Sequence, residues 1–507
     1  MLYNRQRKSL VWNYFTKKGQ FMEKNTRGNF TSNIGFVLAT AGSAIGLGNL
    51  WRFPYLAAKD GGGLFLLIYI VLVLTFGFTL MTAEIAIGRK TGVGPLQAYG
   101  RMDKRFGFLG WMATAVPIII FPYYCVIGGW IVKYGFTYVT GGAGHIYETG
   151  ADPFFGSFIT SQWAPIICFL IFMGVSALIV LFGVEKGIEK ASKIMMPILL
   201  LLIIGIAIYS LTLSHTDADG TRRTALDGLK IYLIPNFDGI TFSKFISILL
   251  DAVGQLFYSL SVAMGIMITY GSYAKKESNL VKSINQIEIF DTGVAILAGL
   301  IIIPSVFVFQ GMEGLKASGP SLMFVSLPRV FEQMGIWGHI IGAIFFVLVF
   351  FAAITSSISL MEAVVTSIID RFKIKRSTAT GICFLGSLII GVVVCLGYNV
   401  FYFNITLPNG NSAQILDILD FITNNLMLPV VALLTCILIG WVCKPKSVID
   451  EISVGLDGKK FARKNLFVVM IKFVAPVFLV VIQIKVMAFL YQTAKLIHKI
   501  IAYISCI

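Results

Sequence analysis

Charged side chains are scarce in this chain of 507 residues. Only 13% of its residues are charged, whereas 57% are hydrophobic, and the mean hydropathy is +0.83. A soluble domain carries about 25% charged residues, so this composition excludes one and requires lipid as the solvent. The net charge of +16 does not indicate a nucleic-acid partner, because the basic residues lie between apolar runs and form no single stripe. We interpret this charge as a determinant of membrane topology.

Cysteine and histidine are also sparse, which bears on enzyme and metal chemistry. The cysteines lie mainly in apolar runs without the paired spacing of a zinc site or a disulfide scaffold, and we expect them to be packing residues. A membrane-embedded enzyme would need a nucleophile with a base, or a metal site. No metal-binding spacing connects the four histidines, which lie in loops, near a span end or in the tail: His145, His215, His339 and His498. The sequence therefore gives little support to an enzyme.

The first thirty residues lack the apolar core and cleavage site of a signal peptide. We therefore expect residues 1–33 to form a cytoplasmic N-terminal arm. Met1 and Met22 are both candidate starts, because the residues after Met22 resemble a natural N-terminus.

Long apolar runs divide the rest of the chain. A membrane-crossing helix needs about 20 mostly apolar residues. Eleven runs meet this requirement, at 34–56, 63–87, 108–137, 164–183, 191–213, 244–271, 283–310, 335–369, 378–397, 413–443 and 464–485. The tail, 486–507, carries Lys495, His498 and Lys499 among aliphatic residues, which fits an amphipathic interfacial helix better than a short twelfth span.

The basic residues orient these spans. Most of the 41 Lys and Arg residues fall in the arm and in the loops 88–107, 184–193, 272–282, 370–377 and 443–464. Because loops rich in Lys and Arg stay inside, we expect these loops to be cytoplasmic and the C-terminus to lie outside. The longer loops 214–243 and 311–334 would then lie at the outer entrance.

Two spans contain residues that do not suit a plain lipid-facing helix. The first has three glycines and an asparagine within 41–49, and the sixth has the sequence SLSVAMG at 259–265. Small residues often serve only for close helix packing. Here Asn49 and Arg52 accompany the glycines, and the two interruptions lie in corresponding places of two halves, which favours helix breaks that line a binding cavity.

The motifs at these positions are specific. They are GLGNLWRFPY at 46–55, DGGG at 60–63, EIAIGR at 84–89, GQLFYSLS at 254–261 and TSS at 355–357. Over residues 27–440 the chain resembles the neurotransmitter:sodium symporter family, and its eleven spans resemble the prokaryotic branch. The resemblance implies an all-α polytopic fold of two inverted five-helix repeats, residues 34–213 and 244–443, around a mid-membrane site. Helices 1 and 6 would be interrupted, and span 11 would follow the repeats.

The resemblance also implies two sodium sites. The first would use Ala44, Asn49, Ser259 and Asp291 together with the carboxylate of the substrate. The second would use Gly42, Ile45, Ala352, Thr355 and Ser356, although intrahelical hydroxyls often bond only to their own helix.

Asp291 departs from the family pattern, which commonly has asparagine at this position. A carboxylate would strengthen cation binding and could replace the chloride that animal relatives need, or it could take up a proton. Ala295, one turn later, lacks the acidic side chain that some bacterial members carry there.

By the same resemblance, the substrate pocket has no charged side chain. Its residues would be Gly46, Leu47, Gly48, Ile120, Tyr124, Tyr258, Ser261, Met264, Ser356 and Leu360. A charged substrate side chain would be buried without a partner, so we expect a neutral, hydrophobic amino acid. Monoamine carriers have aspartate where this chain has Gly46, and glycine leaves room for the carboxylate of an amino acid.

Two gates would close the site in turn. Arg52 and Asp420 would pair on the outer side, with Tyr124 and Tyr258 as a lid. On the inner side Arg27 would pair with Asp370, beside Phe30 and Tyr273. The competing interpretation is that these charges are only solvated or topological.

We therefore expect a sodium-coupled symporter of the cell inner (plasma) membrane that imports an amino acid by alternating access, with two Na⁺ ions and no organic cofactor. A non-transporting amino-acid sensor of the same fold remains the main alternative. A channel is disfavoured because the polar groups gather at one depth and form no continuous path.

Overall fold

The protein is an all-α membrane protein. The computed structural model describes residues 28–217, 219–317, 319–406, 412–456, 458, 460–484 and 486–487. Within them, nine helices are long and apolar enough to cross a membrane, and a tenth crossing is a pair of helices bent by 53°. Arg27 and almost all of the expected tail helix fall outside the described residues.

The first five crossings follow the expected order. They are built from α2 (Asn33–Ala44), η1 (Gly48–Arg52) and α3 (Phe53–Lys59); α4 (Gly63–Leu72), η2 (Val73–Gly77) and α5 (Phe78–Thr91); α7 (Gly107–Val139); α10 (Ala164–Leu181); and η4 (Val184–Glu189) with α11 (Lys190–Ser210).

The second half of the chain begins with two separate helices where the sixth span was expected, and this pair is not among the ten crossings counted above. The elements of this half are α13 (Phe242–Ser259) and α14 (Ile266–Tyr273); α15 (Leu280–Gly314); α18 (Ile336–Phe372); α19 (Arg376–Leu396); and α20 (Ile415–Phe421), η6 (Ile422–Met427), α21 (Leu428–Ile437) and η7 (Leu438–Val442). The eleventh crossing, 464–484, begins with α23 (Lys464–Val469) and η8 (Met470–Val474).

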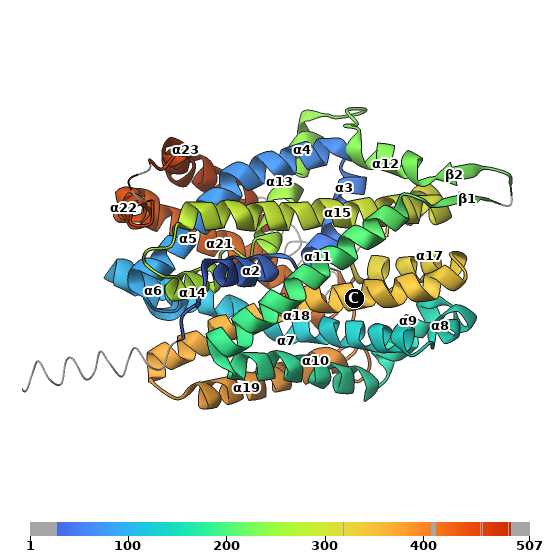
Figure 1. Cartoon of the computed structure of the whole chain (residues 1–507), viewed down its shortest axis with the longest axis horizontal. Coiled ribbons are helices and arrows are strands. Elements are labelled where there is room, and N and C mark those ends of the chain that lie inside the picture. Colours follow the sequence, from blue (N-terminus) through green and yellow to red (C-terminus); the bar gives the residue numbers. More distant parts are fainter. Residues whose placement is uncertain are drawn as a thin grey trace, which may run out of the picture.

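Short elements connect the crossings at the two ends of the bundle. One set is α6 (Pro95–Met102), η3 (Lys104–Phe106) and α22 (Lys446–Ser453). The other set is α8 (Ala143–Thr149), α9 (Ala151–Thr160), β1 (Ser214–Thr216), β2 (Arg222–Thr224), α12 (Ala225–Leu233), α16 (Gly319–Ser321), η5 (Leu322–Ser326), α17 (Leu327–Gln333), β3 (Ile405–Thr406) and β4 (Ser412–Ala413). Figure 1 shows α6 and α22 at one end, and α8, α9 and the β1–β2 hairpin at the other.

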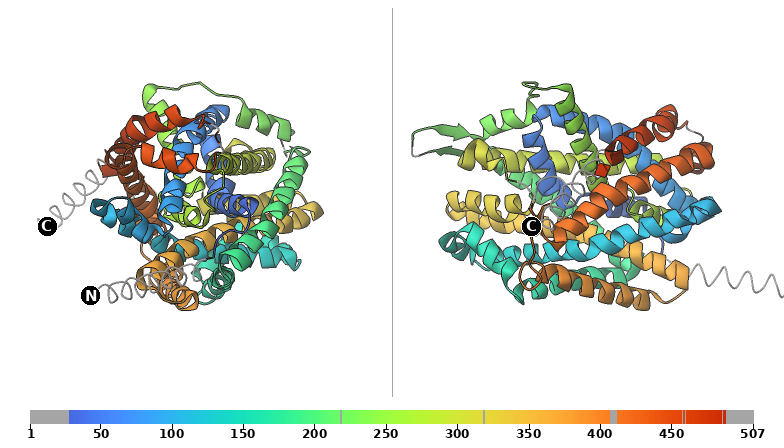
Figure 2. Two further views of the ribbon diagram at one scale, coloured as in Figure 1. Left: turned by 60° about the vertical axis from the view of Figure 1, so that its left-hand side comes forward. Right: turned by 180° about the vertical axis from the view of Figure 1, so that it is seen from behind.

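Burial distinguishes central from peripheral crossings. The most apolar window of the α7 crossing is 78% buried by protein, whereas that of the 464–484 crossing is only 28% buried. α7 packs against α18, α10 and α6 in the interior. Figure 2 shows the C-terminal helices, in red, at the rim of the bundle. Apolar side chains of the 464–484 crossing are exposed there, among them Val469, Val477 and Ile484, as expected of a surface that faces lipid.

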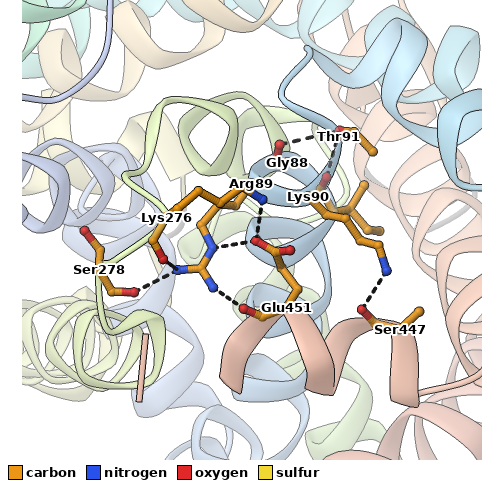
Figure 3. Close-up of polar contacts among 9 residues, drawn as sticks. Gly88, Arg89, Lys90, Thr91, Lys276, Ser278, Ser447 and Glu451 are labelled. Atoms are coloured by element: carbon orange, nitrogen blue, oxygen red, sulfur yellow. Dashed lines mark hydrogen bonds and ion pairs between the residues drawn. The ribbon is translucent and has the colours of Figure 1, made fainter. Parts of the chain in front are cut away.

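An arginine cluster joins three segments at the α6–α22 end (Figure 3). Arg89, at the end of α5, donates to the Glu451 carboxylate at 2.8 Å and to the Ser278 carbonyl at 2.7 Å. It also donates to the carbonyls of Glu451 and Lys276. The Arg89 side chain is 0% exposed, so all of these acceptors are needed to satisfy a guanidinium that water does not reach.

Replacing Arg89 should destabilise the protein because Glu451 would lose its buried partner. We expect Arg89→Gln to cost about 2–3 kcal/mol, near the low end for a broken buried pair, since Lys276 still reaches Glu451 at 3.0 Å. The midpoint of thermal unfolding in detergent measures this. Arg105→Gln is the control, because Arg105 pairs with Asp103 but its side chain is 75% exposed. Equal midpoints for the two variants would contradict this account.

Candidate cation and ligand sites

The two helix breaks meet in the middle of the bundle. The first break lies between α2 and η1, and the second lies between α13 and α14. Ser261, at a positive φ of 51° in the second break, donates to the Ser43 carbonyl at 2.9 Å. Gln255 donates to the Gly48 carbonyl at 3.0 Å. Side chains of the second broken segment thus satisfy carbonyls at the first break, as an apolar interior requires.

Residues of α5 and α6 also hold the second break in place. The Ala263 amide donates to Glu84 of α5 at 2.7 Å, and Ala263 has a positive φ of 63°. Gly265 has a φ of 72°, and a Cβ there would lie 2.6 Å from Cγ of Pro95. Glycine is therefore required at Gly265 both for its backbone conformation and for the approach of α6.

The first predicted cation cluster is assembled around Asp291 of α15. Asn49 Nδ2 donates to Asp291 Oδ1 at 2.7 Å, and Ser259 Oγ donates to the same oxygen at 2.7 Å. All three residues are fully buried. The Tyr69 side chain on α4 also faces Asp291 and was not among the predicted residues, because a tyrosine in an apolar span gives no distinguishing signal.

The second predicted cluster joins α18 to the first break. Ser356 Oγ lies 3.4 Å from the carbonyl oxygens of Gly42 and Ile45, and 3.0 Å from that of Ser43. The Thr355 hydroxyl instead donates within its own helix, to the carbonyls of Phe351 and Ala352 at 3.0 and 3.1 Å. The Ser356 hydroxyl also lies 3.3 Å from the Ala352 carbonyl of its own helix, so both hydroxyls bond within α18 and only that of Ser356 also reaches the first break.

A small cavity of about 30 Å³ borders both helix breaks. The structure brings nine of the predicted substrate residues to its wall: Gly46, Leu47, Ile120, Tyr124, Tyr258, Ser261, Met264, Ser356 and Leu360. Ser43, Ala44 and Ile266 complete the lining. The Ala44 expected at a sodium site thus borders this cavity, and Ser43 and Ile266 could have been found because they flank the predicted breaks.

The remaining predicted substrate residue, Gly48, lies behind the wall of this cavity. A Cβ on Gly48 would stand 2.2 Å from Cδ1 of Tyr258, so the absence of a side chain allows the tyrosine ring to close over the break. The Tyr124 hydroxyl is buried and makes no hydrogen bond among the described residues. No charged side chain is among the residues that line the cavity.

A larger cavity of about 560 Å³, which shares Tyr258 with the small one, is lined by both Arg52 and Asp420. Among the described ion pairs within 4.0 Å, none joins these two residues, so the expected outer pair is not closed in this structure. Asp420 accepts from Tyr123 at 3.1 Å and from Asn424 at 2.6 Å. The Arg52 guanidinium instead lies 6.0 Å from the centroid of the Tyr258 ring.

The opposite side is closely packed. Phe30 is 2% exposed, and its ring centroid lies 6.2 Å from that of Tyr273. Tyr273 donates to Glu362 at 2.6 Å, and Asp370 accepts from the Gly94 amide at 2.6 Å. The predicted partner of Asp370, Arg27, lies outside the described residues, so their pairing stays a prediction.

Sequence comparisons agree with this geometry. The profile of the sodium:neurotransmitter symporter family matches residues 27–143 and 157–501. An uncharacterized sodium-dependent transporter of Bacillus subtilis is 33% identical over 456 residues, covering 89% of this chain and 96% of the relative. The human sodium- and chloride-dependent GABA transporter 2 is 25% identical, covering 84% of this chain and 75% of the relative.

A solved structure shares the fold. The crystal structure of MhsT in complex with L-phenylalanine superimposes with a TM-score of 0.79 and is 33% identical, covering 91% of this chain and 100% of that one. Proteins with these names are sodium-dependent transporters and not enzymes. The chain therefore belongs to the sodium:neurotransmitter symporter family.

Proposed function

We propose that this sodium-dependent symporter imports a neutral, hydrophobic amino acid by alternating access. The observation that most directly supports the proposal is the uncharged cavity that borders both helix breaks, together with the two clusters of oxygen atoms at these breaks. The structural relative MhsT was solved with L-phenylalanine, which is an amino acid of this class. The cytoplasmic N-terminus and the outside C-terminus in the inner (plasma) membrane belong to the same proposal.

The carboxylate of the amino acid would bind at the first helix break. The segment η1–α3 begins beside Leu47, and the N-terminal end of a helical segment presents free amides to an anion. The buried Tyr124 hydroxyl, without a partner among the described residues, would donate a further hydrogen bond. The apolar side chain would then face Ile120, Met264 and Leu360, where a charge would be left unpaired.

Sodium would bind on either side of the substrate. Asn49, Ser259 and Asp291, with the Ala44 carbonyl and the substrate carboxylate, offer oxygen atoms for one ion. The Gly42 and Ile45 carbonyls, Ala352, Thr355 and Ser356 offer oxygen atoms for a second. Broken membrane helices commonly coordinate sodium with carbonyls that their breaks release.

Because the substrate carboxylate would also be a ligand of the first sodium ion, the sodium gradient would be coupled to the import of the amino acid. Each ligand completes the shell of the other, so each must raise the affinity of the other by the same factor. The open outer cavity and the packed Phe30–Tyr273 contact describe one end state of the cycle. In the opposite state we expect Arg52 to approach Asp420 while the Phe30 contact opens.

The proposal is tested by uptake into proteoliposomes. The full chain would be reconstituted, and a panel of labelled amino acids offered with an inward sodium gradient or with potassium instead. We expect sodium-dependent accumulation above equilibrium of neutral hydrophobic amino acids, and no accumulation of lysine or glutamate. Saturable binding without accumulation would identify a sensor instead, and equilibration independent of sodium would identify a channel.

Tyr124→Phe should weaken substrate binding because it removes the hydroxyl that we assign to the carboxylate. One hydrogen bond to a charged group is worth about 1.5–3 kcal/mol, so the dissociation constant should rise at least about tenfold. Tyr138→Phe is the matched control. Tyr138 lies on the same helix as Tyr124, and its buried hydroxyl also has no hydrogen bond among the described residues, but it does not line the cavity. Equal affinities in equilibrium binding of the two variants would refute the role of Tyr124.

Asp291→Asn should weaken sodium binding, because it removes the negative charge among the ligands of the first ion. We expect the sodium concentration for half-maximal uptake to rise about tenfold, equivalent to about 1.4 kcal/mol. Replacing chloride by gluconate should leave wild-type uptake unchanged and should inhibit the variant. Wild-type uptake that itself requires chloride would show that the carboxylate does not replace the anion.

A further inference from the structure

A cleft lined by lysines lies at the α6–α22 end of the bundle, outside the sites described above. It has a volume of about 350 Å³, between α22 and the start of the 464–484 crossing. We name it the lysine cleft, after Lys444, Lys446, Lys464 and Lys472. Asp450 is the one acidic residue among its lining residues, so positive charge prevails. Within the described chain, no ion pair within 4.0 Å engages any of these four lysines.

Lys472 shows that the cleft extends along the 464–484 crossing. It lies eight residues beyond Lys464 on a continuous helix, which places it about 12 Å along the helix axis. Its side chain is only half-buried, and its Nζ lies 5.8 Å from the ring centroid of Trp441. A lysine at this depth extends toward the interface and requires an anionic or polar partner there.

Trp441 marks the level of the lipid headgroups. Its side chain is 57% exposed, and its indole donates to the Lys472 carbonyl at 3.2 Å. Phe473, which is 53% exposed, packs against it edge-on with the ring centroids 5.7 Å apart. Exposed aromatic side chains at the end of a crossing typically lie at the membrane–water interface. The cleft therefore opens beside lipid as well as toward water.

Lys444 has an unusual backbone conformation at the turn into α22. It adopts a positive φ of 65°, which a residue with a side chain rarely takes. Its carbonyl accepts from both the amide and the hydroxyl of Ser447, at 3.0 and 2.9 Å, which fixes the turn into α22. A glycine would satisfy this turn without strain, so a lysine here carries a conformational cost.

From these observations we infer that the lysine cleft binds the phosphate headgroup of an anionic phospholipid of the leaflet it faces. Several lysines converge on one concave site, and a lysine presents a compact positive charge with three donors to phosphate oxygens. The acyl chains would lie along the exposed aliphatic and aromatic face of the 464–484 crossing, beside Trp441 and Phe473. Basic pockets between helices at a membrane surface bind phospholipid headgroups in this way. The inference is independent of the transported substrate.

The simpler interpretation is that these lysines only enforce topology, as Lys and Arg do in cytoplasmic loops. That role needs no cleft, no lysine inside the crossing and no strained turn. It also predicts that lysines in other loops attract anionic lipid equally well. The two interpretations therefore differ in whether lipid binding depends on position or only on total charge.

The experiment counts lipids that remain bound to the full-length protein. Wild-type protein would be exposed to phosphatidylglycerol in phosphatidylcholine membranes, and retained lipid counted by native mass spectrometry. The cleft variant replaces Lys444, Lys446, Lys464 and Lys472 by glutamine. The matched control replaces Lys104, Lys186, Lys190 and Lys375, which are exposed lysines of other loops at the same end by our topology. Both variants remove the same charge.

We expect one phosphatidylglycerol per wild-type and control chain, and at least about tenfold lower occupancy in the cleft variant, since each lysine near a membrane surface contributes several-fold. Thermal midpoints in pure phosphatidylcholine check that the variants are folded. Lys472→Gln alone provides a second, milder variant and should also lower the occupancy. Equal retention by the cleft and control variants would overturn the inference.

A last experiment distinguishes binding of the lipid from binding of soluble phosphate. Wild-type protein in pure phosphatidylcholine would be titrated with inorganic phosphate. Saturable phosphate binding that the cleft variant lacks, without retention of phosphatidylglycerol, would overturn the lipid assignment.

Discussion

The structure depends on one constraint, which is that backbone amides and carbonyls cannot remain unpaired in hydrocarbon. Two crossings are interrupted at mid-membrane, and each interruption needs partners that an ordinary crossing does not. Ser261 and Gln255 donate to carbonyls of the first break, while Glu84 accepts from the second. Carbonyls that remain near Ser356 are then available to a cation. The same break thus carries the structural cost and supplies the carbonyls of the proposed cation site.

Conformational change follows from where the two broken crossings make contact. On one side Arg52 and Asp420 face a wide cavity without a direct pair, and on the other Phe30 packs on Tyr273. In the proposed cycle, closing one side while opening the other would move the half-helices relative to α7 and α18, which pack together in the interior. The Arg89 cluster holds α5 to α22 and to the segment after α14 (Figure 3), so movement at that end must be shared or must break these bonds.

The sequence indicated the two breaks, because glycine and asparagine at mid-span have few alternatives. The residues of the expected substrate pocket came from the family resemblance, and nine of them line one cavity. The resemblance also placed Asp291 beside Asn49 and Ser259, and their hydrogen bonds join them. The sequence could not predict the separation of Arg52 and Asp420, because that distance depends on the conformation and not on residue type. Tyr69 was missed since its neighbours are uniformly apolar, and the lysine cleft was missed because its residues are separated in sequence by the loop after α22.

The central claim is that sodium and the amino acid share a ligand shell around the first break. The most direct test is equilibrium binding of the transported amino acid by isothermal titration calorimetry at several sodium concentrations, with the sodium affinity measured at several amino-acid concentrations. The account predicts that each ligand tightens the other by the same factor. An amino-acid affinity that does not change between sodium and potassium would contradict it.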